Sequence, residues 1–116
     1  MSCGIKDAKW STPEGVSEKG RKAAEIIRTY VQELDLLGTS GGAVFRDPAE
    51  WDDDYGRSSL LIVVHEGLDA GPCLSMDGAY NSGCGYALYE ALTDRLREVG
   101  LFMEQCTTWY SAIYEI

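Results

Sequence analysis

The chain of 116 residues lacks several features that would place it in a protein class at once. A membrane-spanning helix needs about 18 consecutive apolar residues, and no apolar run in the chain approaches that length. The first residues lack the apolar core of a secretion signal. It has a single histidine, and no C-x-x-C pair occurs among its four cysteines, Cys3, Cys73, Cys84 and Cys106. A structural zinc site is therefore not predicted, and the cysteines are expected to be buried thiols. We expect a cytoplasmic protein without a cofactor.

Positive charge is scarce outside the N-terminal quarter. Residues 1–30 carry six Lys and Arg and four Asp and Glu, whereas residues 31–116 carry four Lys and Arg and fifteen Asp and Glu. The first part has a net charge of +2 and the rest −11, which together give the −9 of the whole chain. Such a field repels nucleic acid and anionic membranes and attracts basic partners. The same negative charge could simply keep a small protein soluble, so the charge by itself does not define a function.

The strongest fold signal is the apolar run LLIVVH at residues 60–65. Alternation along a strand places Leu60, Ile62 and Val64 on one face and Leu61 and Val63 on the other. A strand that is apolar on both faces lies in the middle of a sheet. This run is therefore predicted to be the central strand.

Further strands are predicted on either side of the central run. Residues 43–46 and 73–77 predict two strands that form an antiparallel meander with it. Residues 101–116 are rich in β-formers, contain no turn signal, and predict one long strand with a bulge near Thr107. This last strand places Tyr110 and Tyr114 on one face and Trp109 and Ile113 on the other.

Two amphipathic helices are predicted from apolar residues spaced three and four apart. The first begins after Ser17 as N-cap, ends near Leu37, and is followed by Gly38. The second presents Leu88, Leu92, Leu96 and Val99 on one face and stops at Gly100. The predicted fold is a single α+β domain over residues 1–116, in the order α-β-β-β-α-β, with a loose lead-in at residues 1–16. Both helices are expected to cover one face of an antiparallel sheet.

That arrangement leaves the second face of the sheet without a helix, although the central strand is apolar on both faces. We expect this face to be covered by the N-terminal segment with Trp10, by residues 47–55 with Trp51 and Tyr55, or by a partner subunit.

The candidate binding site is the acidic segment, defined as residues 47–55. It places five carboxylates within eight residues and adds two aromatic side chains; its members are Asp47, Glu50, Trp51, Asp52, Asp53, Asp54 and Tyr55. Carboxylates two residues apart in an extended chain are about 6.8 Å apart, similar to successive phosphates of a nucleic-acid strand. The segment could thus occupy a Lys/Arg groove built for nucleic acid, with Trp51 and Tyr55 as anchors. A solvated loop is the alternative, and the spacing does not match an EF-hand calcium loop.

Three other groups of residues are candidates for chemistry. His65 ends the central strand and could act as a base beside a cysteine nucleophile, Cys73, Cys84 or Cys106. The glycine-rich run at residues 78–85 precedes a helix but lacks the lysine of a phosphate-binding loop. The aromatic residues at 109–114 lack the basic neighbours of a base-stacking surface. We therefore predict no catalytic, cofactor or metal residues.

Two segments resemble those of short proteins from bacteriophages and prophages: residues 104–114 (EQCTTWYSAIY) and residues 17–24 (SEKGRKAA). Small acidic phage proteins of this kind include anti-CRISPR and other anti-defence inhibitors. The resemblance implies a non-enzymatic inhibitor that binds a basic, nucleic-acid-binding surface of a host complex, such as a CRISPR effector, without binding nucleic acid or membrane itself. The alternatives are a phage assembly protein that homodimerises through its second sheet face, and a small thiol-dependent enzyme.

Overall fold

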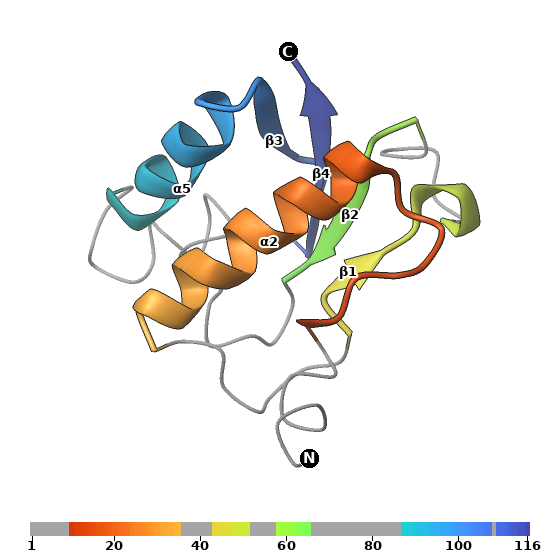
Figure 1. The fold of residues 1–116 in the computed structure, drawn as a ribbon, viewed down its shortest axis with the longest axis horizontal. Coiled ribbons are helices and arrows are strands. Elements are labelled where there is room, and N and C mark those ends of the chain that lie inside the picture. The colour runs from red at the N-terminus through yellow and green to blue at the C-terminus, as the bar shows by residue number, and fades with distance from the viewer. Residues whose placement is uncertain (1–9, 36–42, 52–57, 66–86, 108) are drawn as a thin grey trace.

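The computed structural model describes residues 10–35, 43–51, 58–65, 87–107 and 109–116. Two helices and four strands follow one another in the order α-β-β-α-β-β (Figure 1). The helices are α2 (Glu18–Glu33) and α5 (Ala87–Arg97). The strands are β1 (Phe45–Arg46), β2 (Leu61–Val64), β3 (Leu101–Gln105) and β4 (Tyr110–Glu115). The α+β class is confirmed.

The four strands form one antiparallel sheet in the order β1-β2-β4-β3. β2 is central, as its apolar faces predicted, and its register pairs Leu61 with Ile113 and Val64 with Tyr110. Both edges of β2 are thus occupied, by β1 and by β4. The predicted meander placed residues 73–77 beside β2, but β4 occupies that edge of β2. Residues 73–77 themselves lie outside the described residues.

The predicted long C-terminal strand is a hairpin of β3 and β4. The chain turns after Gln105, and the N–H groups of Cys106 and Thr107 both donate to the carbonyl oxygen of Tyr110, at 3.1 and 3.2 Å. The hydroxyl of Thr107 accepts from the N–H groups of Trp109 and Tyr110, at 3.2 and 3.3 Å. A threonine side chain therefore supplies the turn hydrogen bonds, which explains why no glycine, proline or asparagine signals this turn.

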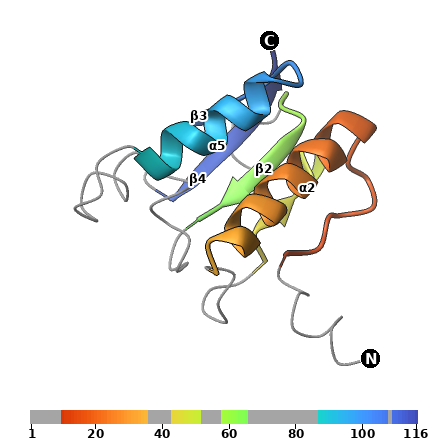
Figure 2. The ribbon, with the colours of Figure 1, turned by 60° about the vertical axis from the view of Figure 1, so that its left-hand side comes forward.

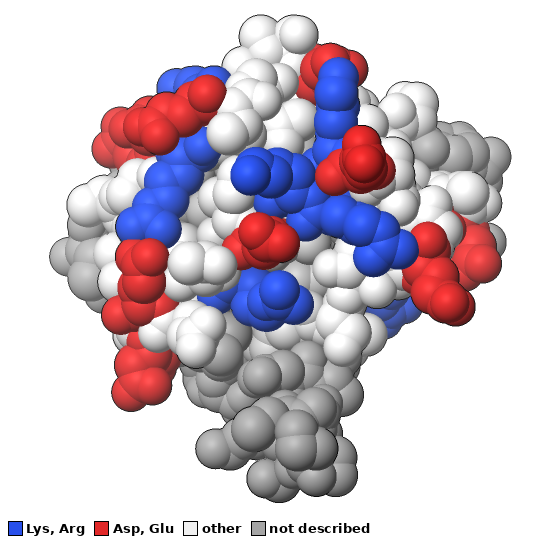
Figure 3. Space-filling model, in the orientation of Figure 1, with Lys and Arg blue, Asp and Glu red and all other residues white. Residues whose placement is uncertain are grey.

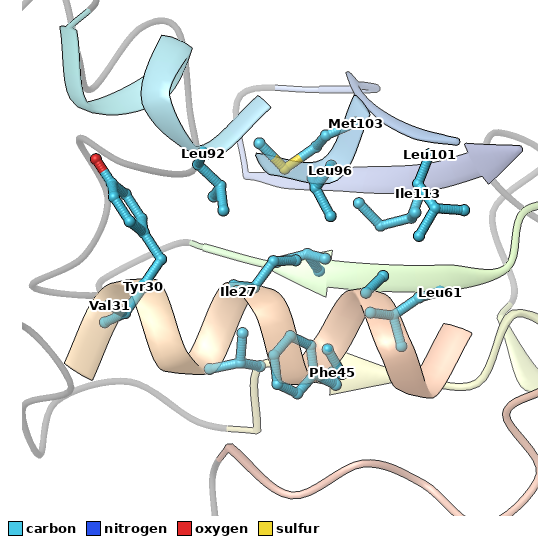
Figure 4. Close-up of a cluster of buried hydrophobic side chains, with 14 of the residues drawn as sticks. Ile27, Tyr30, Val31, Phe45, Leu61, Leu92, Leu96, Leu101, Met103 and Ile113 are labelled. Atoms are coloured by element: carbon cyan, nitrogen blue, oxygen red, sulfur yellow. The ribbon is translucent and has the colours of Figure 1, made fainter. Parts of the chain in front are cut away.

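Both helices pack on the same face of the sheet, as predicted (Figure 2). The core on this side is fully buried and draws Ile27 from α2, Leu92 and Leu96 from α5, and Leu61 and Ile113 from the central strands (Figure 4). A fully buried aliphatic side chain stabilises the fold by roughly 1.5–3 kcal/mol. Val99 was expected on this core face, but it follows the end of α5 and is 45% exposed.

Of the predicted loose lead-in, residues 10–16 are described, and two of them, Trp10 and Val16, are buried in the core. Trp10 is fully buried and meets Phe45 edge to face, with ring centroids 5.8 Å apart. It therefore belongs to the helix side of the sheet and does not cover the second face. Ser17 caps α2 as predicted, since its hydroxyl accepts from the N–H of Gly20 at 3.2 Å.

The helix α2 ends at Glu33, short of the predicted end at Leu37. Asp35 adopts a left-handed conformation with φ of 57°, a conformation that stops a helix. The second helix, α5, ends at Arg97 and is followed by the predicted glycine, Gly100, which has a positive φ of 82°. No described helix is long and apolar enough to cross a membrane.

An exposed ion pair joins the two helices. Arg95 of α5 donates to both carboxylate oxygens of Glu33 on α2, at 2.6 and 3.2 Å, and its guanidinium lies 4.7 Å from the ring centre of Tyr30. The Tyr30 hydroxyl in turn donates to the carbonyl of Leu88 at 3.0 Å. The hydrogen bond from Arg95 holds the pKa of Glu33 below its usual range. A second pair, Lys19 with Glu115, ties α2 to the end of β4.

We predict that Gly20→Ala destabilises the protein although alanine favours helices. A Cβ at Gly20 would lie 2.4 Å from the carbonyl oxygen of Leu60 and 2.4 Å from Val16 Cγ1. Relieving that contact should cost more than the about 1 kcal/mol gained in helix propensity, for a net loss of about 1–2 kcal/mol in the free energy of unfolding. Urea unfolding measures it, with the exposed Thr29→Ala on the same helix as control. Equal or higher stability for Gly20→Ala would contradict the close approach.

The ion pair predicts a pH dependence of stability. The pKa of Glu33 is lower in the folded protein than in the unfolded chain, so its contribution is present above the unfolded pKa and is lost as the pH falls through the folded pKa. Urea unfolding from about pH 7 to about pH 3 should therefore show a smaller loss of stability for Glu33→Gln than for wild type. Glu25→Gln, an equal charge change on the same helix, should keep the wild-type profile. Parallel profiles for wild type and Glu33→Gln would count against the pair.

Candidate functional site

The second face of the sheet carries a separate hydrophobic cluster. Ile62, Tyr110 and Ala112 are fully buried there, and the half-buried Trp51, Val64, Cys106 and Tyr114 pack against them. The alternation predicted for β2 and β4 is confirmed on this face for Ile62, Val64, Tyr110, Ala112 and Tyr114. Leu60 was predicted here too, but it precedes β2 and packs against the helix-side core. Phe102 of β3 stacks on Tyr114, with ring centroids 5.5 Å apart and planes inclined by 26°. Part of the expected cover of this face is thus supplied by Trp51.

The aromatic cluster, Trp51, Trp109 and Tyr110, joins the acidic segment to the sheet. The ring centroid of Trp51 lies 4.9 Å from that of Tyr110 and 5.8 Å from that of Trp109, and the Trp109 and Tyr110 centroids are 4.7 Å apart. Trp109 was predicted on the face opposite Tyr110, but it lies in the turn before β4, where strand alternation does not apply. It is 37% exposed at the edge of the cluster.

The first half of the acidic segment has a defined structure. Asp47 begins the short 3₁₀ helix Pro48–Glu50, and its carboxylate accepts from the N–H of Ala49 at 3.0 Å. The N–H of Trp51 donates to the carbonyl of Pro48 at 3.1 Å. This turn directs the indole of Trp51 onto the second face while Glu50 stays exposed. Of the predicted site residues, Asp52, Asp53, Asp54 and Tyr55 lie outside the described residues.

Charge is unevenly distributed over the described surface. Helix α2 carries four Lys and Arg (Lys19, Arg21, Lys22, Arg28) and three Glu (Glu18, Glu25, Glu33), a net charge of +1. The other described residues carry three Arg and nine Asp and Glu, a net charge of −6. Figure 3 shows Lys and Arg over α2 across the middle of the helix side, with Asp and Glu among them and at both margins. Helix α2 is therefore less acidic than the rest of the described surface.

His65 has a structural contact on the helix side of the sheet. It is 4% exposed, and its Nε2 lies 3.2 Å from the hydroxyl of Ser111. Ser111 alternates with Tyr110 and Ala112 of the second face, so it points toward the helices. Cys106 packs on the second face, with its thiol directed at the carbonyl of Glu104 at 3.7 Å. His65 and Cys106 thus lie on opposite faces, and Cys106 cannot be a nucleophile activated by His65.

The other three cysteines, Cys3, Cys73 and Cys84, and the glycine-rich run at residues 78–85 lie outside the described residues. Within the described part, no cluster of three or more His, Cys, Asp and Glu could hold a metal ion. On the second face, burial raises the pKa of the Tyr114 hydroxyl, and the nearby Cys106 and Glu104 raise it further.

Comparisons of the chain with protein-family models, curated proteins and solved structures found no match.

We predict that the aromatic cluster depends on Trp51 more than on Trp109. Truncating a fully buried Trp costs about 3–5 kcal/mol, so Trp51→Ala at this half-buried position should lower the free energy of unfolding by about 2 kcal/mol. Trp109→Ala, at the exposed edge, should cost about 1 kcal/mol or less. Urea unfolding of both variants measures the difference. A larger loss for Trp109→Ala would show that Trp51 does not anchor the segment.

Proposed function

We propose that this protein is a non-enzymatic binding protein whose acidic segment docks on a Lys/Arg-rich surface of a partner, a surface built to bind nucleic acid. The observation that carries the proposal is the packing of the Trp51 ring against the rings of Tyr110 and Trp109. In the described half of the acidic segment, an exposed carboxylate, Glu50, directly precedes this packed indole. Anchoring one end of a charged segment lowers the conformational entropy lost on binding.

The charge distribution supports a basic partner. Apart from α2, the described residues carry a net charge of −6, and the chain as a whole carries −9. Such a surface speeds association with a basic groove and suppresses contact with nucleic acid and anionic membranes. Taken with the resemblance to phage proteins, this favours an anti-defence inhibitor, of the anti-CRISPR kind, acting on a host nucleic-acid-processing complex in the cytoplasm.

An assembly protein that pairs through its second sheet face is the alternative. The half-exposed aromatic side chains there, Trp109, Phe102 and Tyr114, are suited to an interface. A two-fold contact, however, sets the same patch of two copies against each other. In this chain it would bring together copies of Arg46, Glu50 and Glu104, a net charge of −1 on each copy. This repulsion favours a basic partner over a second copy.

The proposal predicts that Asp52→Asn, Asp53→Asn and Asp54→Asn together weaken binding to the partner. The tagged protein is used to purify complexes from a bacterial host with active defence systems, washed at low and then at high salt. Each exposed ion pair contributes up to about 1 kcal/mol, so the triple variant should bind on the order of tenfold or more weakly and with a flatter salt dependence.

A matched control removes three exposed carboxylates on α5 and directly after it instead, with Glu90→Gln, Asp94→Asn and Glu98→Gln. This variant has the same net charge as the first and should retain most of the binding. Equal weakening by both variants, or full binding by the Asp52, Asp53 and Asp54 variant, would reject docking through the acidic segment. A dimeric mass at micromolar concentration with no captured complex would favour the assembly protein.

A further inference from the structure

A small cavity lies where the acidic segment begins. It has a volume of about 140 Å³ and is lined by Pro13, Arg46, Asp47, Glu50 and Trp51. A cavity of about 150 Å³ holds a single benzene ring, whereas sites for drug-sized ligands measure roughly 300–1,000 Å³. The cavity is therefore of the size that receives one side chain of a partner protein.

The walls of this cavity are held by contacts outside it. Trp51 rests on Tyr110, which is fully buried, and on Trp109. The backbone of the 3₁₀ helix is closed by the bond from the N–H of Glu50 to the carbonyl of Asp47, at 3.0 Å. A site whose aromatic wall is already positioned loses little entropy when a ligand enters.

The charges around the cavity are negative on balance. Arg46 contributes one positive charge, and Asp47 and Glu50 contribute one negative charge each. The Asp47 carboxylate already accepts the N–H of Ala49, and Arg46 Nε donates to the carbonyl of Ala43 at 3.4 Å. Glu50 is exposed, and none of the ion pairs among the described residues includes it. Its carboxylate is thus available to a cation that enters beside the indole.

We propose that this cavity receives an arginine side chain of the partner, with the guanidinium against Trp51 and paired with Glu50. This inference rests on the proposed function and specifies an arginine as the partner residue that binds beside Trp51. An indole face attracts cations more strongly than other aromatic rings. A planar guanidinium can both stack on the ring and donate two hydrogen bonds to a carboxylate, whereas a lysine ammonium acts as a point charge. Arginine is accordingly favoured over lysine.

The direct test titrates the ¹⁵N-labelled full chain with capped hexa-arginine and follows the indole N–H signals of its three tryptophans. The signal of Trp51 should shift, whereas that of the fully buried Trp10 should stay in place. Hexa-lysine should bind several-fold more weakly. No shift of Trp51, or equal binding of the two peptides, would overturn the proposal.

Charge variants separate the cavity from the overall field of the protein. Glu50→Gln should weaken hexa-arginine binding about fivefold, the scale of one exposed ion pair, whereas Glu104→Gln should leave it nearly unchanged. Arg46→Gln should strengthen binding because it removes the competing cation, and Arg97→Gln on α5 should not. If Glu104→Gln weakened binding as much as Glu50→Gln, or Arg97→Gln strengthened it as much as Arg46→Gln, the proposed arginine site would be rejected. Attraction by the net charge of the protein would then explain the binding.

The two proposals can fail separately. In the variant with Asp52, Asp53 and Asp54 changed to Asn, the Trp51 shift on adding hexa-arginine should persist, because the cavity keeps all its lining residues. If the partner is lost in that variant but Glu50→Gln binds the partner like wild type, the cavity is rejected and the proposed function stands. If hexa-arginine binds as predicted but no basic partner is captured, the proposed function is rejected and the arginine site stands.

Discussion

The burial of β2 on both faces is the constraint on which the rest of the structure depends. Leu61 and Val63 point to one side, Ile62 and Val64 to the other, and of these only Val64 is not fully buried. A strand of this kind needs an apolar layer on each side and a strand at each edge. β1 and β4 occupy the edges, α2 and α5 cover one face, and the aromatic side chains around Tyr110 provide the layer on the other.

The two layers differ in kind, and this difference places the candidate site. The helix side is closed by regular elements held together by the Arg95–Glu33 pair and by the contacts of Tyr30. The second side is closed in part by a side chain from a loop, Trp51. A loop that packs one side chain into the core is held in place at that residue, whereas the neighbouring residues of the loop can stay exposed to solvent. The described half of the acidic segment therefore ends in a packed indole, with Glu50 facing solvent, and this arrangement is the basis of both proposals.

Much of the fold could be predicted from local pattern. The apolar stripes at spacings of three and four predicted both helices, Ser17 predicted the start of α2, and the doubly apolar run predicted the central strand. The predicted end of α2 at Leu37 was wrong because Asp35 takes a left-handed conformation, which is uncommon for a residue other than glycine. The hairpin at Thr107 was missed because its hydrogen bonds come from a threonine hydroxyl, which is a weaker turn signal than glycine, proline or asparagine.

By itself, the sequence determined the α+β class, the helix-covered face and the position of the acidic segment in the chain, since these follow from periodicity and composition over short distances. Only the tertiary structure decided that β4 lies between β2 and β3, that Trp10 packs on the helix side and Trp51 on the other, and that His65 and Cys106 lie on opposite faces. Each of these depends on contacts between residues far apart in the chain. Their free energy comes from burial in a common core, and a local pattern does not specify which distant surface covers which.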